Sequence, residues 1–238
     1  GPRRLSLWYV CPATPRLMAT DPIADGSGTG EARPSGPVLS LLARGLELWL
    51  RQQVDSIERL EIRLEGSAAR LMGGRLDGVV LEARKVVYRS LRIDRVELRS
   101  DAIQVRMGAL LRGQNLRLDH PFAVRGIVSF NGDDLGRSLA TPAWRGLGDG
   151  LAEDLLGLTP LGALRIEADR LILTASGAGT SVPLEVATRV LADEGTVVLR
   201  SLEGGAEARL PMDPAIRIER ADLAAGLLEL EGEARVSP

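Results

Sequence analysis

The sequence predicts an α+β fold in which a strongly curled antiparallel β-sheet wraps around a long amphipathic helix. Three observations predict it. A stretch with helical spacing and a wide apolar face stands near the start of the chain, many later stretches alternate apolar and polar residues, and one of these is much longer than an ordinary strand. Helices repeat their apolar residues every three to four positions, whereas strands alternate with a period of two. The change of period therefore separates one helix from a series of strands.

The helix is expected at residues 38–56. Its apolar side chains recur at intervals of three and four residues, at Leu39, Leu42, Leu46, Trp49, Leu50 and Val54. Leu41 and Leu48 widen this face, and a wide apolar face suits a helix that a sheet surrounds. Residues 12–37 are rich in Pro, Gly, Ser, Thr and Ala, with too few large apolar side chains to offset the entropy of ordering them. We therefore expect a disordered tail at 1–37 and a single domain at 38–238.

The longest alternating stretch lies in the middle of the chain. Its apolar face comprises Leu116, Leu118, Phe122, Val124, Val128 and Phe130. Natural strands usually have about 5–6 residues, so this stretch predicts a long strand with an apolar inner surface. Asn131 follows it and is the expected cap of a helix at 133–140, because its side-chain oxygen can accept from a free backbone N–H.

Shorter strands are expected on both sides of this stretch, together with one more helix at 144–156. The expected strands are 60–64, 76–88, 91–98, 103–105, 164–174, 182–191, 196–202, 206–210, 216–223 and 227–236.

Two of these strands change their apolar phase halfway along. The segments are LRIDRVEL at 91–98 and IRIERADL at 216–223. A slip of one residue is what a β-bulge produces, and bulges bend sheets. We predict bulges or sharp bends near Asp94–Arg95 and near Glu219–Arg220.

Composition excludes several classes of protein. The net charge of −2 argues against a general binder of nucleic acid, since such proteins carry a clear basic excess, and acids interleave with the arginines. Cys11 is the single cysteine, so no internal disulfide can form. The chain has no run of about 18 apolar residues that could span a membrane. We recognise no export signal, and we expect a cytoplasmic protein that contacts a membrane surface peripherally.

The residues that could support catalysis are sparse. His120 is the only histidine, and a zinc site needs three or four N or S ligands. Ser129 and Asp119 are near His120 in sequence, but strand geometry puts Ser129 on the opposite face of the strand. His120 is better interpreted as part of the lining of the apolar face. The sequence predicts a protein that is not an enzyme and has no metal site and no cofactor.

Three linked segments carry a family resemblance. They are LRIDRVELRSDAIQVR at 91–106, ALLRGQNLRLDHPF at 109–122 and VRGIVSFNGDDLGRSL at 124–139. Ala109-Leu110 with Gly113 and Asp133-Asp134-Leu135 are their landmarks. The chain resembles the actinobacterial and cyanobacterial family that includes the mycobacterial lipoprotein needed for lipomannan elongation. The resemblance implies a fold similar to the tubular lipid-binding domains of bactericidal permeability-increasing proteins, with an apolar groove.

We therefore expect non-catalytic binding of a phospholipid or another amphiphile, with transfer or presentation at a membrane. The side chains expected to line the groove are Leu42, Leu46, Trp49, Leu50, Leu118, Phe122, Val124, Val128, Phe130, Leu184 and Val186. The alternative is a structural or adaptor protein with a closed core that docks a protein partner. A lipid binder should have a continuous apolar groove, whereas an adaptor should have a filled core and an exposed apolar patch of several hundred Å². The oligomeric state stays open.

Overall fold

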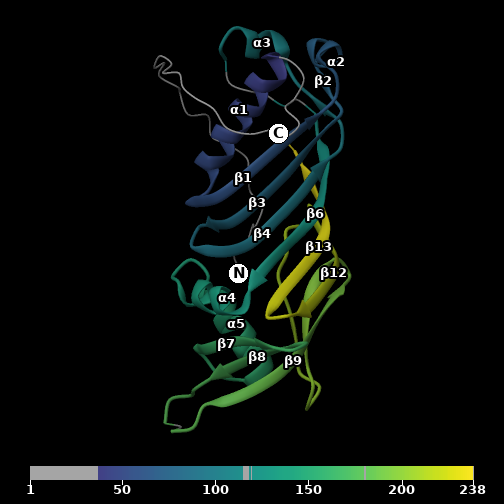
Figure 1. Cartoon of the computed structure of the whole chain (residues 1–238). Coiled ribbons are helices and arrows are strands. Elements are labelled where there is room, and N and C mark those ends of the chain that lie inside the picture. The colour runs from purple at the N-terminus through teal and green to yellow at the C-terminus, as the bar shows by residue number, and fades with distance from the viewer. Residues whose placement is uncertain (1–36, 115–117, 119, 180, 238) are drawn as a thin grey trace.

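The computed structural model describes residues 37–114, 118, 120–179 and 181–237. The molecule is elongated, with one antiparallel sheet above another and helices at the top and between the sheets (Figure 1). The predicted α+β class and the antiparallel pairing are confirmed.

The larger sheet has six strands, all paired antiparallel. Their spatial order is β1 (Ser56–Glu65), β3 (Gly78–Tyr88), β4 (Leu91–Ser100), β6 (Phe122–Asn131), β13 (Leu227–Val236) and β12 (Ile216–Ala224). The pairing of β6 with β13 joins the first half of the chain to its last strands. β6 corresponds to the second half of the long predicted stretch. Leu116 lies outside the described residues, and Leu118 forms an isolated bridge with Val105.

The smaller sheet is inserted in the chain between β6 and β12. Its five strands are β11 (Glu207–Arg209), β10 (Thr196–Ser201), β9 (Leu184–Asp193), β8 (Arg170–Ala175) and β7 (Leu161–Glu167). Each strand pairs with its neighbour in sequence. β12 packs against β9 and β10, and the Ile218 amide donates to the Gly195 carbonyl at 2.8 Å. The two sheets are therefore in direct contact.

Helices α4 (Gly132–Ala140) and α5 (Arg145–Leu156) lead from the larger sheet into the smaller one. Asn131 caps α4 as predicted, since its side-chain oxygen accepts from the amides of Asp133 and Asp134 at 3.0 and 3.4 Å. The Ser138 hydroxyl oxygen accepts from the Arg92 amide at 2.9 Å and so fastens α4 to β4. This cap turns the chain out of β6 and onto the inner side of the sheet.

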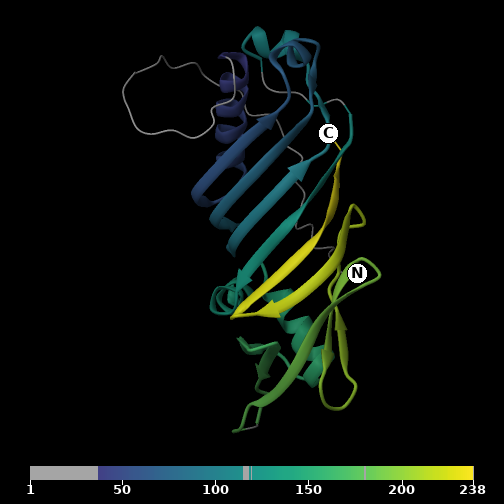
Figure 2. The ribbon, with the colours of Figure 1, turned by 45° about the vertical axis from the view of Figure 1, so that its right-hand side comes forward.

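The expected strongly curled sheet around a long helix is not found. α1 (Pro37–Gln53) has 17 residues and packs against β1 and α2 (Ala68–Met72), at one end of the sheet (Figure 2). Leu41 and Leu48 on its wide face are 57% and 51% exposed, so that face is only partly covered. The reason is that the smaller sheet, α4 and α5 supply the apolar cover that the inner face of the sheet needs. No closure around α1 is required.

Beyond the ends of α1 and α2 lie the short α3 (Met107–Leu111) and a two-stranded ladder of β2 (Arg75–Leu76) with β5 (Ile103–Gln104). They surround a separate apolar cluster, which we call the end core. It comprises Leu39, Leu42, Leu71, Leu76, Ile103, Val105 and Met107. The main core lies between the two sheets and includes Phe130, Trp144, Leu173, Val197, Leu199 and Leu228. A third, smaller cluster of Ala83, Val86 and Val96 lies on β3 and β4.

One of the two predicted bulges is confirmed. Ile218 pairs with Gly232 but Arg220 pairs with Glu231, so Glu219 is an extra residue in β12.

The bulge predicted near Asp94–Arg95 is wrong, because β3 and β4 keep one register on both sides of it. Lys85, opposite Asp94, instead has φ +52 and its ammonium binds the Asp94 carboxylate. In β3 the apolar side chains switch faces at Lys85, and in β4 they switch faces at Asp94, directly opposite. Because both strands switch at the same level, their pairing keeps one register.

Two glycines permit an unusually close contact between strands. Gly126 of β6 pairs with Gly232 of β13. A Cβ on Gly126 would lie 2.0 Å from the Glu97 carbonyl oxygen of β4, and one on Gly232 would lie 2.2 Å from the Arg217 carbonyl oxygen of β12. Only glycine allows backbones to approach in this way. Register places Leu98, Gly126, Gly232 and Ile218 in one row across four strands, which we call the glycine row.

We expect Gly126→Ala to lower the free energy of unfolding by about 3 kcal/mol, because the added methyl group would force β6 away from β4. Urea unfolding measures this change. Gly150→Ala in α5 is the matched control, since nothing lies within 4 Å of its added Cβ. That control should gain up to about 1 kcal/mol from helix propensity. Equal stability of Gly126→Ala and the parent would contradict the close contact.

Candidate functional site

A partly open cavity of about 130 Å³ lies in the main core between the two sheets. β4, β6, β13 and β12 form one wall, and β7, β8, β9, β10 and the segment after β11 form the other. α4 and α5 contribute from one side. The residues that line it are Leu91, Leu98, Val124, Gly126, Val128, Phe130, Leu135, Leu139, Trp144, Leu147, Leu151, Leu164, Leu171, Val190, Val197, Leu199, Leu210, Met212, Ile216, Ile218, Leu228, Leu230, Gly232, Glu233 and Ala234.

The cavity wall is almost wholly hydrocarbon. Trp144 is buried, and its indole N–H donates to the Arg89 carbonyl at 2.8 Å, so the polar atom of that ring is already satisfied. Met212 adds a flexible thioether that adapts to the shape of a guest. Such a wall favours an apolar guest, because it offers almost no partner to a polar group.

Among the described residues that line the cavity, Glu233 alone is charged. Its carboxylate pairs with the Arg125 guanidinium at 2.5 Å. Arg125 is 67% exposed, so this pair lies at the surface of the sheet. The charge on the wall is therefore neutralised by a partner that faces solvent.

The whole glycine row borders the cavity. Its two central members have no side chain, so the wall at this point is backbone. The close backbone contacts of the row thus lie directly beside the cavity.

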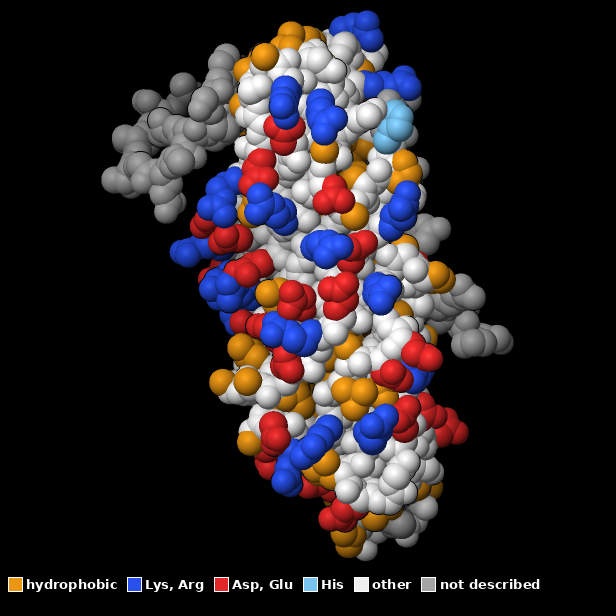
Figure 3. Space-filling model, turned by 90° about the vertical axis from the view of Figure 1, so that its right-hand side faces the viewer, with side chains coloured by type: hydrophobic (Ala, Val, Ile, Leu, Met, Phe, Trp, Pro, Cys, Tyr) orange, Lys and Arg blue, Asp and Glu red, His pale blue; other side chains and the backbone are white. Residues whose placement is uncertain are grey.

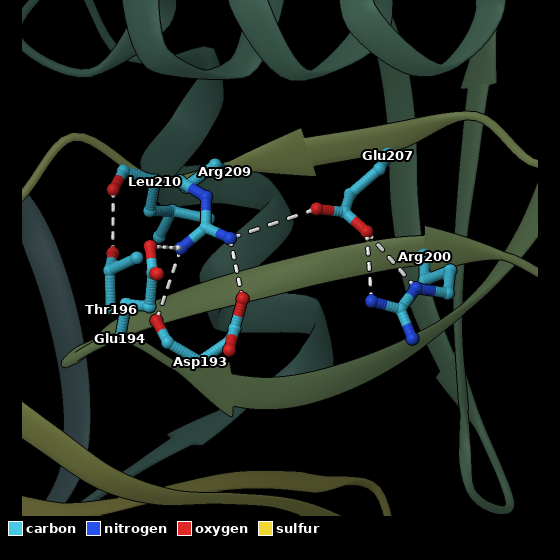
Figure 4. Close-up of polar contacts among 7 residues, drawn as sticks. All are labelled: Asp193, Glu194, Thr196, Arg200, Glu207, Arg209 and Leu210. Carbon is cyan, nitrogen blue, oxygen red and sulfur yellow. Dashed lines mark hydrogen bonds and ion pairs between the residues drawn. The ribbon is translucent and has the colours of Figure 1, made fainter.

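A group of polar contacts holds the opposite wall in place (Figure 4). Thr196 is buried, and its hydroxyl donates to the Leu210 carbonyl at 2.6 Å. Arg209 donates to the Asp193 carboxylate at 2.6 Å and to the Asp193 carbonyl at 3.1 Å. β11 has only three residues, and these contacts extend its attachment to β9 and β10. They therefore fix the segment that carries the lining residues Leu210 and Met212.

A second ion pair joins β10 to β11, the edge strand of the smaller sheet. The Arg200 guanidinium of β10 lies 2.9 Å from the Glu207 carboxylate of β11. Hydrogen bonding to Asp193 raises the pKa of the Arg209 guanidinium, which is charged in any case.

Other shifted pKa values belong to ion pairs outside the cavity. Hydrogen bonding to Asp94 raises the pKa of Lys85. Hydrogen bonding to Arg165 lowers the pKa of the Glu185 carboxyl, and the same pair, with Glu167, raises the pKa of Arg165. These groups are fixed charges on the outside of the sheets.

Three of the predicted lining residues reach the cavity, namely Val124, Val128 and Phe130 of β6. Val186 packs against the main core without lining the cavity. Leu184 does not line it and is 51% exposed, because it stands at the first position of β9, beyond the cover of the other sheet.

The remaining predicted residues lie at the other end of the molecule. Leu42 is buried in the end core, and Leu118 and Phe122 pack against that core. Leu46, Trp49 and Leu50 are half-buried on α1. The apolar face of the long predicted stretch thus runs from the end core to the cavity, rather than facing one cavity throughout.

His120, expected in the lining, is exposed and precedes β6. No three His, Cys, Asp or Glu side chains in the described part of the chain lie close enough to hold a metal ion. Within the same residues, no helix has both the length and the apolar character needed to cross a membrane.

Sequence reasoning missed the contribution of α4, α5 and the smaller sheet. Trp144, Leu147 and Leu151 recur at helical spacing, which is the signal that an apolar helix face covers the cavity. Three glycines in that helix weakened the signal.

Comparison with known families agrees with an apolar binding site. The model of the LmeA-like phospholipid-binding family matches residues 35–233. Neither the curated proteins nor the solved structures that were searched gave a match. The match spans all the described helices, both sheets except the last three residues of β13, and the whole cavity wall except Ala234. The chain belongs to the LmeA-like phospholipid-binding family.

Proposed function

We propose that the protein binds a phospholipid non-catalytically, with part of one acyl chain inserted in the cavity between the sheets. The observation that carries this proposal is the apolar cavity of about 130 Å³, in a chain whose family is described as phospholipid-binding. The headgroup stays outside, since a phosphate would find almost no polar partner within the cavity wall.

The size of the cavity limits how much of the acyl chain it holds. An engineered protein cavity of about 150 Å³ takes up one benzene, so this cavity accommodates a segment of about six carbons. At about 0.8 kcal/mol for each buried CH₂, that segment contributes about 5 kcal/mol. Association loses translational and rotational freedom at a cost of similar size or larger. The rest of the acyl chain must therefore gain further contacts.

The apolar side of β6 supplies a path for those contacts. Val124 lines the cavity, and Phe122 lies two residues further along the same side, next to the end core. Leu118 continues in the same direction and is half-buried. We infer that the acyl chain extends from the cavity along these side chains.

We further propose that the protein transfers the lipid to a membrane or presents it there. A partly inserted lipid with its headgroup in water can return to a bilayer without unfolding of the protein. The alternative, an adaptor that docks a protein partner, predicts a filled interior, and the cavity supports lipid binding over it.

Quenching by brominated acyl chains locates the lipid. Trp144 lines the cavity, whereas Trp49 lies on α1. We expect phospholipids with brominated acyl chains to quench the fluorescence of the Trp8→Phe/Trp49→Phe protein strongly and that of the Trp8→Phe/Trp144→Phe protein weakly. The reverse result would place the lipid beside α1 and contradict the proposed site. Circular dichroism checks that both proteins are folded.

Filling the cavity should reduce lipid binding. Ala234 lines the cavity and is 9% exposed, so the three carbons added in Ala234→Leu would occupy space proposed for the lipid. We expect the lipid extracted from the purified protein, measured by mass spectrometry, to fall at least fivefold, with the free energy of unfolding changed by no more than about 3 kcal/mol. Ala224→Leu is the matched control, because Ala224 is exposed at the end of β12.

Ala234→Val, which adds two carbons, should give an intermediate loss, a graded result that simple misfolding does not produce. Parental lipid content in Ala234→Leu would rule out occupancy of this cavity.

A further inference from the structure

The end of the molecule away from the smaller sheet has an exposed surface that the lipid cavity does not use. α2 and α3 lie side by side there (Figures 1 and 2). β2 pairs with β5, and the Val105 amide donates to the Gly74 carbonyl at 2.8 Å, so the chain after α2 is joined to the chain before α3. We call the exposed side chains of 66–76 and 102–114 the end surface.

Two large apolar side chains project from this surface. Met72, the last residue of α2, is 54% exposed, and Leu111, the last residue of α3, is 55% exposed. Met72 directly follows the buried Leu71, and Leu111 lies four residues after the buried Met107, both members of the end core. These helices are therefore anchored from beneath while their outer apolar side chains face water.

The charge on the end surface differs from that of the whole chain. Residues 66–76 and 102–114 contain Arg70, Arg75, Arg106 and Arg112 and no Asp or Glu, although the chain has 32 acidic against 30 basic residues. Three acids flank these ranges: Glu65, which pairs with Arg99, the exposed Asp101, and Asp77, which lies 2.8 Å from Arg70 and 3.8 Å from Arg75. Figure 3 shows hydrophobic and basic side chains gathered at the upper end, whereas acidic and basic side chains mix further down.

We propose that the end surface docks the protein on a bilayer that contains anionic phospholipids. Exposed Leu and Met side chains can enter the boundary between headgroups and acyl chains, while arginines around them bind lipid phosphates. Each basic residue near an anionic leaflet adds attraction that salt screens. The combination of protruding apolar side chains with a local basic excess fits such a surface better than either feature alone.

Docking at this end is compatible with the path along β6, because that strand begins next to the end core and runs to the cavity. The docking surface nevertheless shares no residue with the cavity wall, so the two proposals can fail separately.

Sedimentation of the lipid-depleted full chain with vesicles tests the docking. We expect binding to vesicles of phosphatidylcholine mixed with phosphatidylglycerol, and at least tenfold weaker binding to phosphatidylcholine alone. Raising NaCl from about 0.1 M to about 1 M shortens the screening length from ~10 Å to ~3 Å and should release the protein. Equal binding to both kinds of vesicle, or no binding to the anionic one, would overturn the proposal.

Paired variants then test the surface itself. Arg75→Gln/Arg112→Gln should weaken binding about thirtyfold, whereas Arg84→Gln/Arg189→Gln, which changes the net charge equally at exposed positions on β3 and β9, should leave it unchanged. Met72→Ser/Leu111→Ser should weaken binding at least tenfold, in contrast to Val182→Ser at the 70% exposed Val182 before β9. Parental binding by both end-surface variants would refute the assignment.

Ala234→Leu separates this proposal from lipid binding in the cavity. It should bind anionic vesicles like the parent even though it carries less lipid. A protein that loads lipid normally but does not sediment with anionic vesicles would leave the cavity proposal standing and remove the docking proposal.

Discussion

The close backbone contact at Gly126 and Gly232 is the constraint on which the rest of the structure depends. These two residues pair with each other in the middle of the larger sheet, and each lies against a carbonyl of its outer neighbour at a distance that excludes a Cβ atom. The contact occurs where the first half of the chain meets its last strands, and the bulge at Glu219 begins one residue beyond the same row. Close backbone contacts and the bulge in β12 therefore lie at one level of the larger sheet. The cavity borders that level, which makes its position a consequence of backbone geometry rather than of one large side chain being absent.

The elements that follow β6 in the chain determine how the inner face of this sheet is covered. Asn131 stops the strand and caps α4, and the chain then builds α5 and the smaller sheet before it returns as β12 and β13. The inserted elements cover the half of the larger sheet that contains the cavity, while α1 and α2 cover the opposite end. Because different elements cover the two ends of the sheet, the main core and the end core are separate, and the inner side of β6 connects them. A single helix surrounded by a curled sheet would have made one continuous core instead.

The sequence predicts local features of this fold well and their combination poorly. The alternation of Val124, Val128 and Phe130 identified side chains that line the cavity, and the cap at Asn131 and the bulge at Glu219 were identified from short patterns. Leu118 and Phe122 continue the same alternation but pack against the end core. Alternation with a period of two indicates which side of a strand is apolar, but it does not indicate which element covers that side. The change of apolar phase at Asp94 produces no bulge, because Lys85 opposite it adopts a left-handed conformation and β3 changes phase at the same level. Lining residues such as Leu199 and Ile216 depend on contacts between strands far apart in the chain, which one sequence does not reveal.

The small volume of the cavity bears directly on how a lipid would be held. A site that buried two complete acyl chains would retain its lipid through the sum of many CH₂ transfers, and exchange with a bilayer would be slow because the rate of release falls with that sum. If a cavity for about six carbons holds the lipid as proposed, most of the lipid contacts half-buried side chains along β6 or water. In the proposed complex, the gain from insertion is close to the cost of association, which is the balance that reversible exchange with a membrane requires. In the proposed arrangement, the acyl chain enters an apolar lining in the main core, whereas the arginines of the end surface bind the membrane at the other end of the molecule. Entry of the chain therefore does not require those arginines to lose their contact with water.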